Sequence, residues 1–545
     1  MNQNENHPRW FRSAPLGRDE AVLPAMLAKW ATASPDALCV RFDTDEEWSY
    51  RDAWSTARTA AAALGKLGIE KGEVVLVWLP NGPALIRAWF GISTLGAVYT
   101  PMNIALRGSM IEHLIRNSGA SVLIAHHELV ERLQTLDVSG LRQIIVCGGD
   151  QVEPVAGVSI VSEAVLSQAQ ALNGQPGLEP WDIAAVLYTS GTTGLAKGVL
   201  VPYAQLSTAG LAAHGYLRAT DRIYIFTPLF HTVAMSAVYA ALGKGASVHV
   251  ADSFRARTFW HDIRAAGCNR ILGLISSMTS YLAKTLPAGE QCPFDFAMMS
   301  PITPDTAEFA KAQSFDYFAA YSMTEISVPI ISPVNSEVYG SCGRQRDGIE
   351  CRLVDRYDND VAPGEVGELI VRSDLPWTMN VGYLNDPVAT AAPGEWFDEP
   401  AAQDAGADGR VARAAGGLVT ADVGAVEERR AGDVEVGPGH VTDEALEEQR
   451  SHDGVGALVR AEVMHVGGAG VQPGVEVLHQ RQGPQGFSGG AGSPGDGVAE
   501  AVVVGQQRGG VGAERRDRRA GQGGEVDDDV GRHRRAVGQH VGQHQ

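Results

Sequence analysis

Short apolar runs alternate with longer segments of mixed polarity through the first 400 residues of the chain. The apolar runs predict buried strands at residues 74–79, 121–125, 143–147, 183–187, 221–226 and 247–250. The segments between them predict helices at 83–95, 109–116 and 234–242. This alternation is typical of an α/β fold, with mostly parallel sheets flanked by helices. Ligand sites in such folds lie at the carboxyl ends of the strands.

A second pattern follows nearer to residue 400. The runs 350–355 and 367–371 flank a turn of sequence Ala-Pro-Gly-Glu, which predicts a smaller β-rich subdomain. We therefore expect an N-terminal arm at 1–19, a large α/β core of several subdomains at 20–334, and the β-rich subdomain at 335–397.

The composition changes sharply near residue 400. Residues 401–545 hold 31 of the 63 glycines, and Phe487 is their one aromatic residue. They contain no Lys, Ile, Asn, Tyr, Trp or Cys. Large side chains are needed to offset the conformational entropy lost on folding. We therefore expect residues 398–545 to be disordered or poorly folded.

Two interpretations of this low-complexity segment compete. One is a natural tail, and the other is a reading-frame change in a GC-rich gene. A wrong frame over GC-rich codons yields mainly Gly, Ala, Arg, Val and Pro, and it loses the A/T-rich codons for Lys, Ile, Asn and Tyr. The loss of all four residue types at one point favours the frame change, since a natural linker is more often enriched in Ser, Pro or Lys.

Whole-chain properties narrow the class of protein. The formal net charge is −20, so the chain has no basic excess with which to bind nucleic acid in general. No apolar stretch reaches the roughly 18 residues that span a bilayer. The polar N-terminus predicts no secretory signal. The six cysteines form no C-x-x-C pair and suit a reducing compartment, so we expect a cytoplasmic location.

The most informative stretch is residues 187–199, Leu-Tyr-Thr-Ser-Gly-Thr-Thr-Gly-Leu-Ala-Lys-Gly-Val. Glycines let backbone N–H groups curl around an anion, while hydroxyls and one lysine add donors and charge. These residue types after a strand predict a polyphosphate-binding loop. The spacing does not fit G-x-x-x-x-G-K-[ST], which disfavours a P-loop ATPase.

This loop resembles the signature loop of the acyl-adenylate-forming superfamily, which includes acyl-CoA synthetases, adenylation domains and luciferases. Ala196 stands where the family usually has Pro. The resemblance implies that the loop binds the phosphates of ATP. The implied nucleotide-binding residues in the loop are Thr189, Ser190, Gly191, Thr192, Thr193, Gly194 and Lys197.

Further motifs agree in order and spacing. Residues 321–325, Tyr-Ser-Met-Thr-Glu, resemble an element in which the aromatic ring stacks on adenine, the threonine contacts phosphate and the glutamate binds Mg²⁺. This implies those roles for Tyr321, Thr324 and Glu325, and Ser322 replaces the usual glycine. Residues 228–231, Pro-Leu-Phe-His, resemble the element at the mouth of the acyl pocket, which implies a gating role for His231. The implied catalytic residues are Lys197, Thr324, Glu325 and His231.

The resemblance covers roughly residues 20–397 and is nearest to crotonobetaine/carnitine–CoA ligase-like acyl-CoA synthetases. This closer resemblance rests on residues 255–260 and 382–387. It implies a ligase, connected with fatty acid metabolism, that uses ATP, Mg²⁺, CoA and a carboxylic acid. The acid forms an acyl-adenylate, and the CoA thiolate then displaces AMP to form a thioester. Residues 299–304 lack the Gly-Gly-Ala element of most relatives, which weakens the expected adenine contact there.

The family continues with a Thr-Gly-Asp that binds ribose and with a lid domain that carries a catalytic lysine. Here Glu395-Trp396-Phe397 is followed by neither. Residues 398–545 stand in place of that lid, so we expect ATP binding with severely reduced turnover.

Two alternatives stay open beside the acid–CoA ligase. One is an adenylation enzyme that feeds a carrier protein, and the other is a non-catalytic nucleotide-binding protein. The acid itself and the oligomeric state are not predicted. Five positions fit either the acid pocket or the core equally well: Val233, Met235, Leu274, Ser277 and Met278.

Overall fold

The computed structural model describes residues 16–149, 151–174, 176–189, 195–355, 357–362 and 366–391, together with the backbone of 411–420 and 437–438. All of these residues belong to one unit, residues 1–465. The expected N-terminal arm lies outside them up to residue 15, and so does loop segment 190–194.

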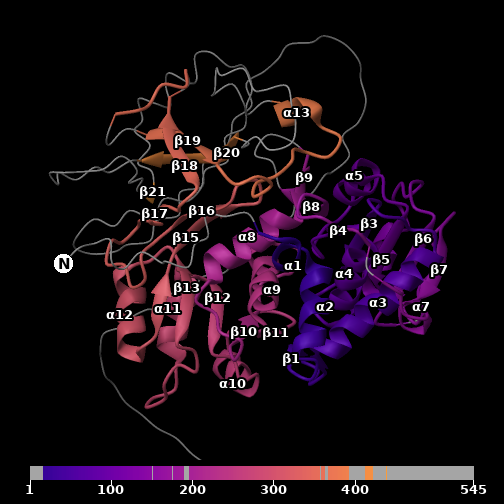
Figure 1. Cartoon of the computed structure of the whole chain (residues 1–545), viewed down its shortest axis with the longest axis horizontal. Helices are drawn as coiled ribbons and strands as arrows, with labels where there is room; N and C mark the ends of the chain where they lie inside the picture. Colours follow the sequence, from indigo (N-terminus) through magenta and orange to yellow (C-terminus); the bar gives the residue numbers. More distant parts are fainter. Residues whose placement is uncertain are drawn as a thin grey trace, which may run out of the picture. The chain divides into compact units, whose positions relative to one another are not determined.

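Two seven-stranded sheets form the α/β part of the structure (Figure 1). The strand order of the first is β7 (Ser159–Ser162), β6 (Gln143–Cys147), β5 (Val122–His126), β3 (Val74–Trp78), β4 (Val98–Pro101), β8 (Ile183–Thr189) and β9 (Lys197–Pro202). Neighbouring strands are parallel except for β9, which pairs antiparallel with β8.

The second sheet has the same character. Its order is β14 (Asp316–Phe318), β13 (Phe296–Ser300), β12 (Arg270–Ile275), β10 (Arg222–Ile225), β11 (Ser247–Val250), β1 (Leu38–Phe42) and β2 (Glu47–Ser49). Only β2 runs antiparallel to its neighbour. Strand β1 joins this sheet from far away in the sequence, because Val40 pairs with Val248.

Helices cover the sheets, as their apolar faces require. Those of the first 215 residues are α1 (Arg18–Ala21), α2 (Leu23–Ala33), α3 (Tyr50–Lys66), α4 (Pro83–Leu95), α5 (Ser109–Ser118), α6 (His127–Val130), the 3₁₀ helix η2 (Glu131–Leu133), α7 (Val165–Gln168) and α8 (Tyr203–His214). Those that follow are α9 (Thr232–Lys244), α10 (Phe259–Ala265), α11 (Ser276–Thr285), α12 (Pro304–Gln313) and α13 (Pro387–Ala391).

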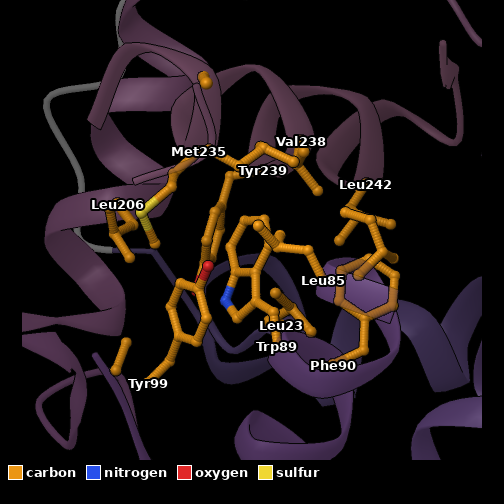
Figure 2. Packing of buried hydrophobic residues seen from close by; sticks show 14 of the residues in the cluster. Leu23, Leu85, Trp89, Phe90, Tyr99, Leu206, Met235, Val238, Tyr239 and Leu242 are labelled. Atoms are coloured by element: carbon orange, nitrogen blue, oxygen red, sulfur yellow. The ribbon is translucent and has the colours of Figure 1, made fainter. Parts of the chain in front are cut away.

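One buried cluster connects the two sheets. Trp89 on α4 stacks on Tyr99 of β4 at 5.3 Å between ring centroids and lies 6.1 Å from Tyr239 of α9. Figure 2 shows these three rings packed with aliphatic side chains from α2, α4, α8 and α9. Fully burying one such side chain contributes roughly 1.5–3 kcal/mol, so this cluster fixes the two sheets against each other.

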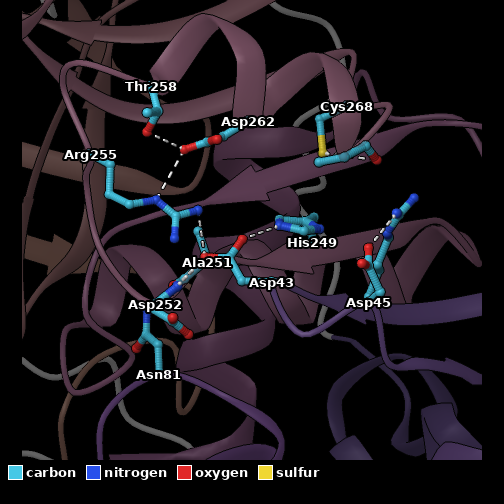
Figure 3. A network of polar contacts seen from close by, with 12 residues as sticks. Asp43, Asp45, Asn81, His249, Ala251, Asp252, Arg255, Thr258, Asp262 and Cys268 are labelled. Atoms are coloured by element: carbon cyan, nitrogen blue, oxygen red, sulfur yellow. Dashed lines mark hydrogen bonds and ion pairs between the residues drawn. The ribbon is translucent and has the colours of Figure 1, made fainter. Parts of the chain in front are cut away.

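A polar network ties the end of β1 to β11 and α10 (Figure 3). Asp43 accepts a hydrogen bond from His249 Nε2 at 2.9 Å and pairs with Arg255 at 2.8 Å. Arg255 also donates to Asp262 at 3.0 Å, and Thr258 donates to the same carboxylate at 2.7 Å. The network lies at the carboxyl ends of β1 and β11 and links them to the N-terminus of α10.

Two smaller antiparallel sheets follow. One has the order β15 (Ala320–Met323), β16 (Ser327–Ile331) and β17 (Arg344–Gln345). The other has the order β18 (Ile349–Val354), β19 (Val366–Ser373), β20 (Val411–Thr420) and β21 (Gly437–Pro438). The backbone of β20 pairs with β19 along most of its length, although it lies beyond residue 397, where we expect the β-rich subdomain to end.

The predicted fold class is confirmed, with parallel sheets flanked by helices and a small β-rich part. Helix α4 and strands β6 and β11 have the bounds that the sequence indicates. Among the described residues, no helix is long and apolar enough to cross a membrane. The expected domain boundaries remain predictions, and most of residues 398–545 lie outside the described part of the chain.

Candidate functional site

The predicted phosphate loop connects β8 to β9 in a hairpin. Thr189 is the last residue of β8 and pairs directly with Lys197, the first residue of β9. The hairpin therefore holds the hydroxyl and the ammonium at the mouth of the loop, at the carboxyl end of β8. Residues Ser190–Gly194 lie outside the described part of the chain.

A distant segment pairs with this hairpin through an isolated β-bridge between Val199 and Tyr383. The N–H of Leu200 donates to the carbonyl of Gly382 at 2.9 Å, and the N–H of Leu384 donates to Gly198 at 2.7 Å. This places the ring of Tyr383 beneath Lys197, with the ammonium 5.2 Å from the ring centroid. Such a cation–π contact steadies the lysine without neutralising its charge.

Glu325 lies where these elements meet. The hydroxyl of Tyr383 donates to Glu325 Oε1 at 3.2 Å, and the Thr189 hydroxyl lies 3.5 Å from the same oxygen. Glu325 is only 7% exposed. Burial raises the pKa of Tyr383, and the neighbouring carboxylate raises it further, so the phenol stays a donor. Thr189, Lys197 and Glu325, predicted from three separate positions, are thus brought together.

The carboxylate environment indicates how a metal would be held. Among the described residues, no group of three or more His, Cys, Asp or Glu side chains could hold an ion. Glu325 is a single carboxylate with two hydroxyls at one oxygen. Mg²⁺ is commonly bound by one or two carboxylates together with substrate phosphates. The residues present therefore fit a magnesium ion that arrives with ATP rather than a resident metal.

Thr324 and Tyr321 flank this carboxylate. The amide of Gln205 on α8 donates to the Thr324 carbonyl at 2.7 Å, which fixes the turn between β15 and β16. Tyr321 on β15 is half-buried, and burial together with the nearby thiols and Glu325 raises its pKa to about 12. Its ring packs against the cluster that includes Ile326 of the small sheets.

His231 occupies the N-cap position of α9 without a side-chain capping bond, and its ring centroid lies 4.4 Å from that of Phe230. The side chain is exposed, yet nearby protein atoms partly desolvate it and lower its pKa below the ordinary histidine value. Directly after it, Thr232 and Val233 line a pocket. The histidine therefore stands next to that pocket, where we expect a gating residue.

The pocket lies between α8, α9 and the strands β13, β15 and β16. Its polar lining residues are Gln205, Thr232, Ser236, Ser322 and Ser327. Its apolar lining residues are Leu206, Ala209, Val233, Met298, Ala320, Met323 and Val328. Ser322 and Met323 directly precede Thr324 and Glu325 in the chain, so the pocket opens beside the candidate phosphate site.

Of the five positions that fit either the acid pocket or the core, one lines the pocket, three lie in or against the core, and one does neither. Val233 lines the pocket. Met235 and Leu274 are buried in the core, and Met278 packs against the second core cluster. Ser277 is exposed. Three residues of the site were missed by sequence reasoning: Tyr383, Gln205 and Ser327. The only sequence signal for Tyr383 was its place in the family-like segment 382–387. No sequence motif marked Gln205 or Ser327.

Comparison with known proteins identifies the class. A family model described as AMP-binding enzyme matches residues 27–384. The crotonobetaine/carnitine–CoA ligase of Salmonella arizonae is 28% identical over 357 residues, which cover 64% of this chain and 69% of that protein. The corresponding ligase of an Escherichia coli strain is 29% identical over 356 residues, 63% of this chain and 68% of that protein.

Solved structures share the fold. The N-terminal domain of FACL13 from Mycobacterium tuberculosis superposes with a TM-score of 0.60 at 21% identity, over 69% of this chain and 94% of that one. The anthranilate CoA ligase AuaEII, solved with anthranoyl-AMP, gives a TM-score of 0.62 at 21% identity, over 70% of this chain and 75% of that one.

The candidate site lies within the segment that the AMP-binding enzyme model matches. The chain belongs to the AMP-binding enzyme family, and its matched relatives include acyl-CoA ligases. The expected resemblance to crotonobetaine/carnitine–CoA ligases is confirmed.

Proposed function

We propose that this protein binds Mg·ATP at the β8–β9 hairpin and adenylates a carboxylic acid held in the neighbouring pocket. The observation that carries the proposal is the convergence of Thr189, Lys197 and Glu325 beside the pocket. A carboxylate oxygen attacks the α-phosphorus of ATP, and the bond to the pyrophosphate oxygen breaks. Catalysis of this kind depends on positioning and on stabilising charge at phosphorus.

Each predicted residue has a role in this proposal. Lys197 and the hydroxyl and N–H groups of residues 189–194 bind the phosphates. Glu325 would hold Mg²⁺, and the metal would supply charge neutralisation at the phosphates. Tyr321 stacks on adenine, and Thr324 contacts the α-phosphate. His231 stands at the pocket mouth and gates the acid between the two half-reactions.

The second half-reaction would form a CoA thioester with release of AMP, which makes the protein an acid–CoA ligase. That step in the family relies on a lid lysine, and the last lysine of this chain is Lys311. Arginine cannot readily replace it, because a planar guanidinium differs from a compact ammonium. We therefore expect adenylation and thioester formation by this chain to be severely reduced, while ATP binding is retained.

Pyrophosphate exchange tests the proposal. The purified full chain is supplied with ATP, Mg²⁺, labelled pyrophosphate and a panel of carboxylic acids, with and without CoA. Weak, acid-dependent exchange is expected, and Lys197→Ala should lower it at least tenfold, since the ammonium faces the phosphates. Lys66→Ala, at the exposed end of α3, serves as the control. Robust thioester formation would contradict the expected loss of turnover.

The absence of a late lysine also supports a second candidate, a non-catalytic nucleotide-binding protein. ATP binding without acid-dependent exchange favours it. Labelling of a phosphopantetheine carrier protein instead of CoA would favour an adenylation enzyme that serves a carrier.

A further inference from the structure

Two buried polar side chains of the pocket have unsatisfied atoms. Gln205 is 2% exposed and Ser327 is 5% exposed. Gln205 Oε1 and Ser327 Oγ are both buried, and neither has a hydrogen-bond partner in the described part of the chain. Leaving a buried polar atom unpaired costs about 1–3 kcal/mol. Gln205 on α8 and Ser327 on β16 both line one pocket. Their two unpaired atoms point to a ligand that pairs with them.

The orientation of Gln205 is fixed by its other amide atom. Its Nε2 donates to the Thr324 carbonyl at 2.7 Å, so the remaining oxygen can only accept. Ser327 supplies a hydroxyl, which both donates and accepts. The pocket thus offers one fixed acceptor and one adaptable hydroxyl. A hydroxyl group on the ligand matches this pair in chemistry, because a hydroxyl can donate to an amide oxygen and accept from a serine.

The rest of the lining offers no partner for a charged ligand group. Among the residues that line the pocket, none is charged and none is aromatic. A quaternary ammonium group is recognised by aromatic faces or by a carboxylate, and a second carboxylate needs a cation. The remaining walls are aliphatic side chains and methionines, such as Leu206, Val233 and Met298.

We propose that this pocket selects an uncharged carboxylic acid that carries a hydroxyl group, with Gln205 and Ser327 as the residues that recognise it. The inference rests on the proposed function, since it assumes that the pocket holds the acid to be adenylated. This preference would distinguish the chain from the relatives named for crotonobetaine and carnitine. Both of those compounds carry an ammonium group, which this pocket lining does not match. A site built to hydrogen-bond a substrate hydroxyl discriminates strongly against the analogue that lacks it.

Binding of stable acyl-adenylate analogues tests the inference without requiring turnover. The full chain is titrated calorimetrically with sulfamoyladenosines that carry butanoyl, 2-, 3- or 4-hydroxybutanoyl, or 4-(trimethylammonio)butanoyl groups. At least one hydroxybutanoyl isomer should bind tenfold or more tightly than butanoyl, and the trimethylammonio compound should bind more weakly than butanoyl. Equal or weaker binding of all three hydroxy isomers, or preference for the ammonium compound, would overturn the inference.

Two buried serines, Ser327 and Ser207, supply a test variant and a matched control. Ser327→Ala should bring the ratio of hydroxybutanoyl to butanoyl affinity close to one. Ser207→Ala should leave the ratio as it is, because that buried hydroxyl already donates to the carbonyl of Tyr203 on its own helix. A ratio unchanged by Ser327→Ala would remove Ser327 from the recognition of the hydroxyl.

A titration with ATP distinguishes failure of the substrate inference from failure of the proposed function. If the chain binds ATP and butanoyl-sulfamoyladenosine without favouring a hydroxyl, only the substrate inference fails. If neither ATP nor any analogue binds, the proposed function fails and the substrate inference fails with it.

Discussion

At the scale of single residues, Tyr383 holds the candidate phosphate site together. Its ring supports Lys197 and its hydroxyl donates to Glu325, so one side chain contacts both charged groups. Lys197, Thr189 and Glu325 could be predicted because their chemistry lies in short local motifs. Tyr383 could not, because its contact with Glu325 joins residues 58 positions apart and exists only in the folded chain.

Removing the Tyr383 hydroxyl should destabilise the fold. Hydrogen bonds to charged groups contribute about 1.5–3 kcal/mol when buried. Tyr383→Phe keeps the ring beneath Lys197 and should lower the free energy of unfolding by about 1–2 kcal/mol. Tyr281→Phe, on an exposed tyrosine, should change it by less than about 0.5 kcal/mol. Urea denaturation measures both, and equal stabilities of the two variants would contradict the contact.

At the scale of elements, the sequence predicts those helices and strands whose ends are marked by local residues. Helix α4 could be bounded because Pro83 occupies its first turn and Gly96, at a φ of 82°, ends it in the left-handed region. The pairing of β1 with β11 could not be predicted, since it joins strands about two hundred residues apart. The pairing of segment 381–384 with β9 could not be predicted either, because this segment has no local strand pattern.

The crossing of α3 and α4 depends on a glycine. A Cβ built on Gly91 would lie 2.5 Å from the Cβ of Ala60, a rigid neighbour. Gly91→Ala should therefore lower the free energy of unfolding by about 1–3 kcal/mol through overpacking. Gly65→Ala is the control, because its Cβ would meet Leu95 Cδ1 at an ordinary 3.6 Å. That change should be neutral or slightly stabilising, as Ala favours helix. Thermal unfolding that shifts equally in both would contradict this packing.

At the scale of the whole molecule, the Asp43–His249 pair couples stability to pH. His249 is buried against Tyr224, and burial lowers its pKa despite the nearby Asp43, with Arg41 and Arg222 acting in the same direction as burial. The unfolded chain therefore binds a proton more readily. Stability from this group is present above the unfolded pKa of about 6.5 and is lost as the pH falls below it.

This linkage can be measured by urea denaturation between pH 5.5 and 7.5. The free energy of unfolding should fall on acidification, with a contribution from His249 of at most about 1.4 kcal/mol per pH unit. His249→Gln keeps a donor toward Asp43 but does not titrate, so its pH dependence should be shallower. A variant with the same slope as the unmodified chain would show that His249 is not the group responsible.

The change of composition near residue 400 remains the largest feature that the sequence alone shows. It separates a chain segment with a matched family and a described fold from one that has neither lysine nor Thr-Gly-Asp. The expected nucleotide-binding residues all precede this change of composition, and no lysine follows it.

The most direct test of the central claim is a calorimetric titration of ATP into the full chain in the presence of Mg²⁺. We expect saturable one-site binding that weakens at least tenfold in Glu325→Gln and depends on Mg²⁺, because Glu325 would hold the metal. No binding by the unmodified chain, or binding that is the same in Glu325→Gln and without Mg²⁺, would contradict it.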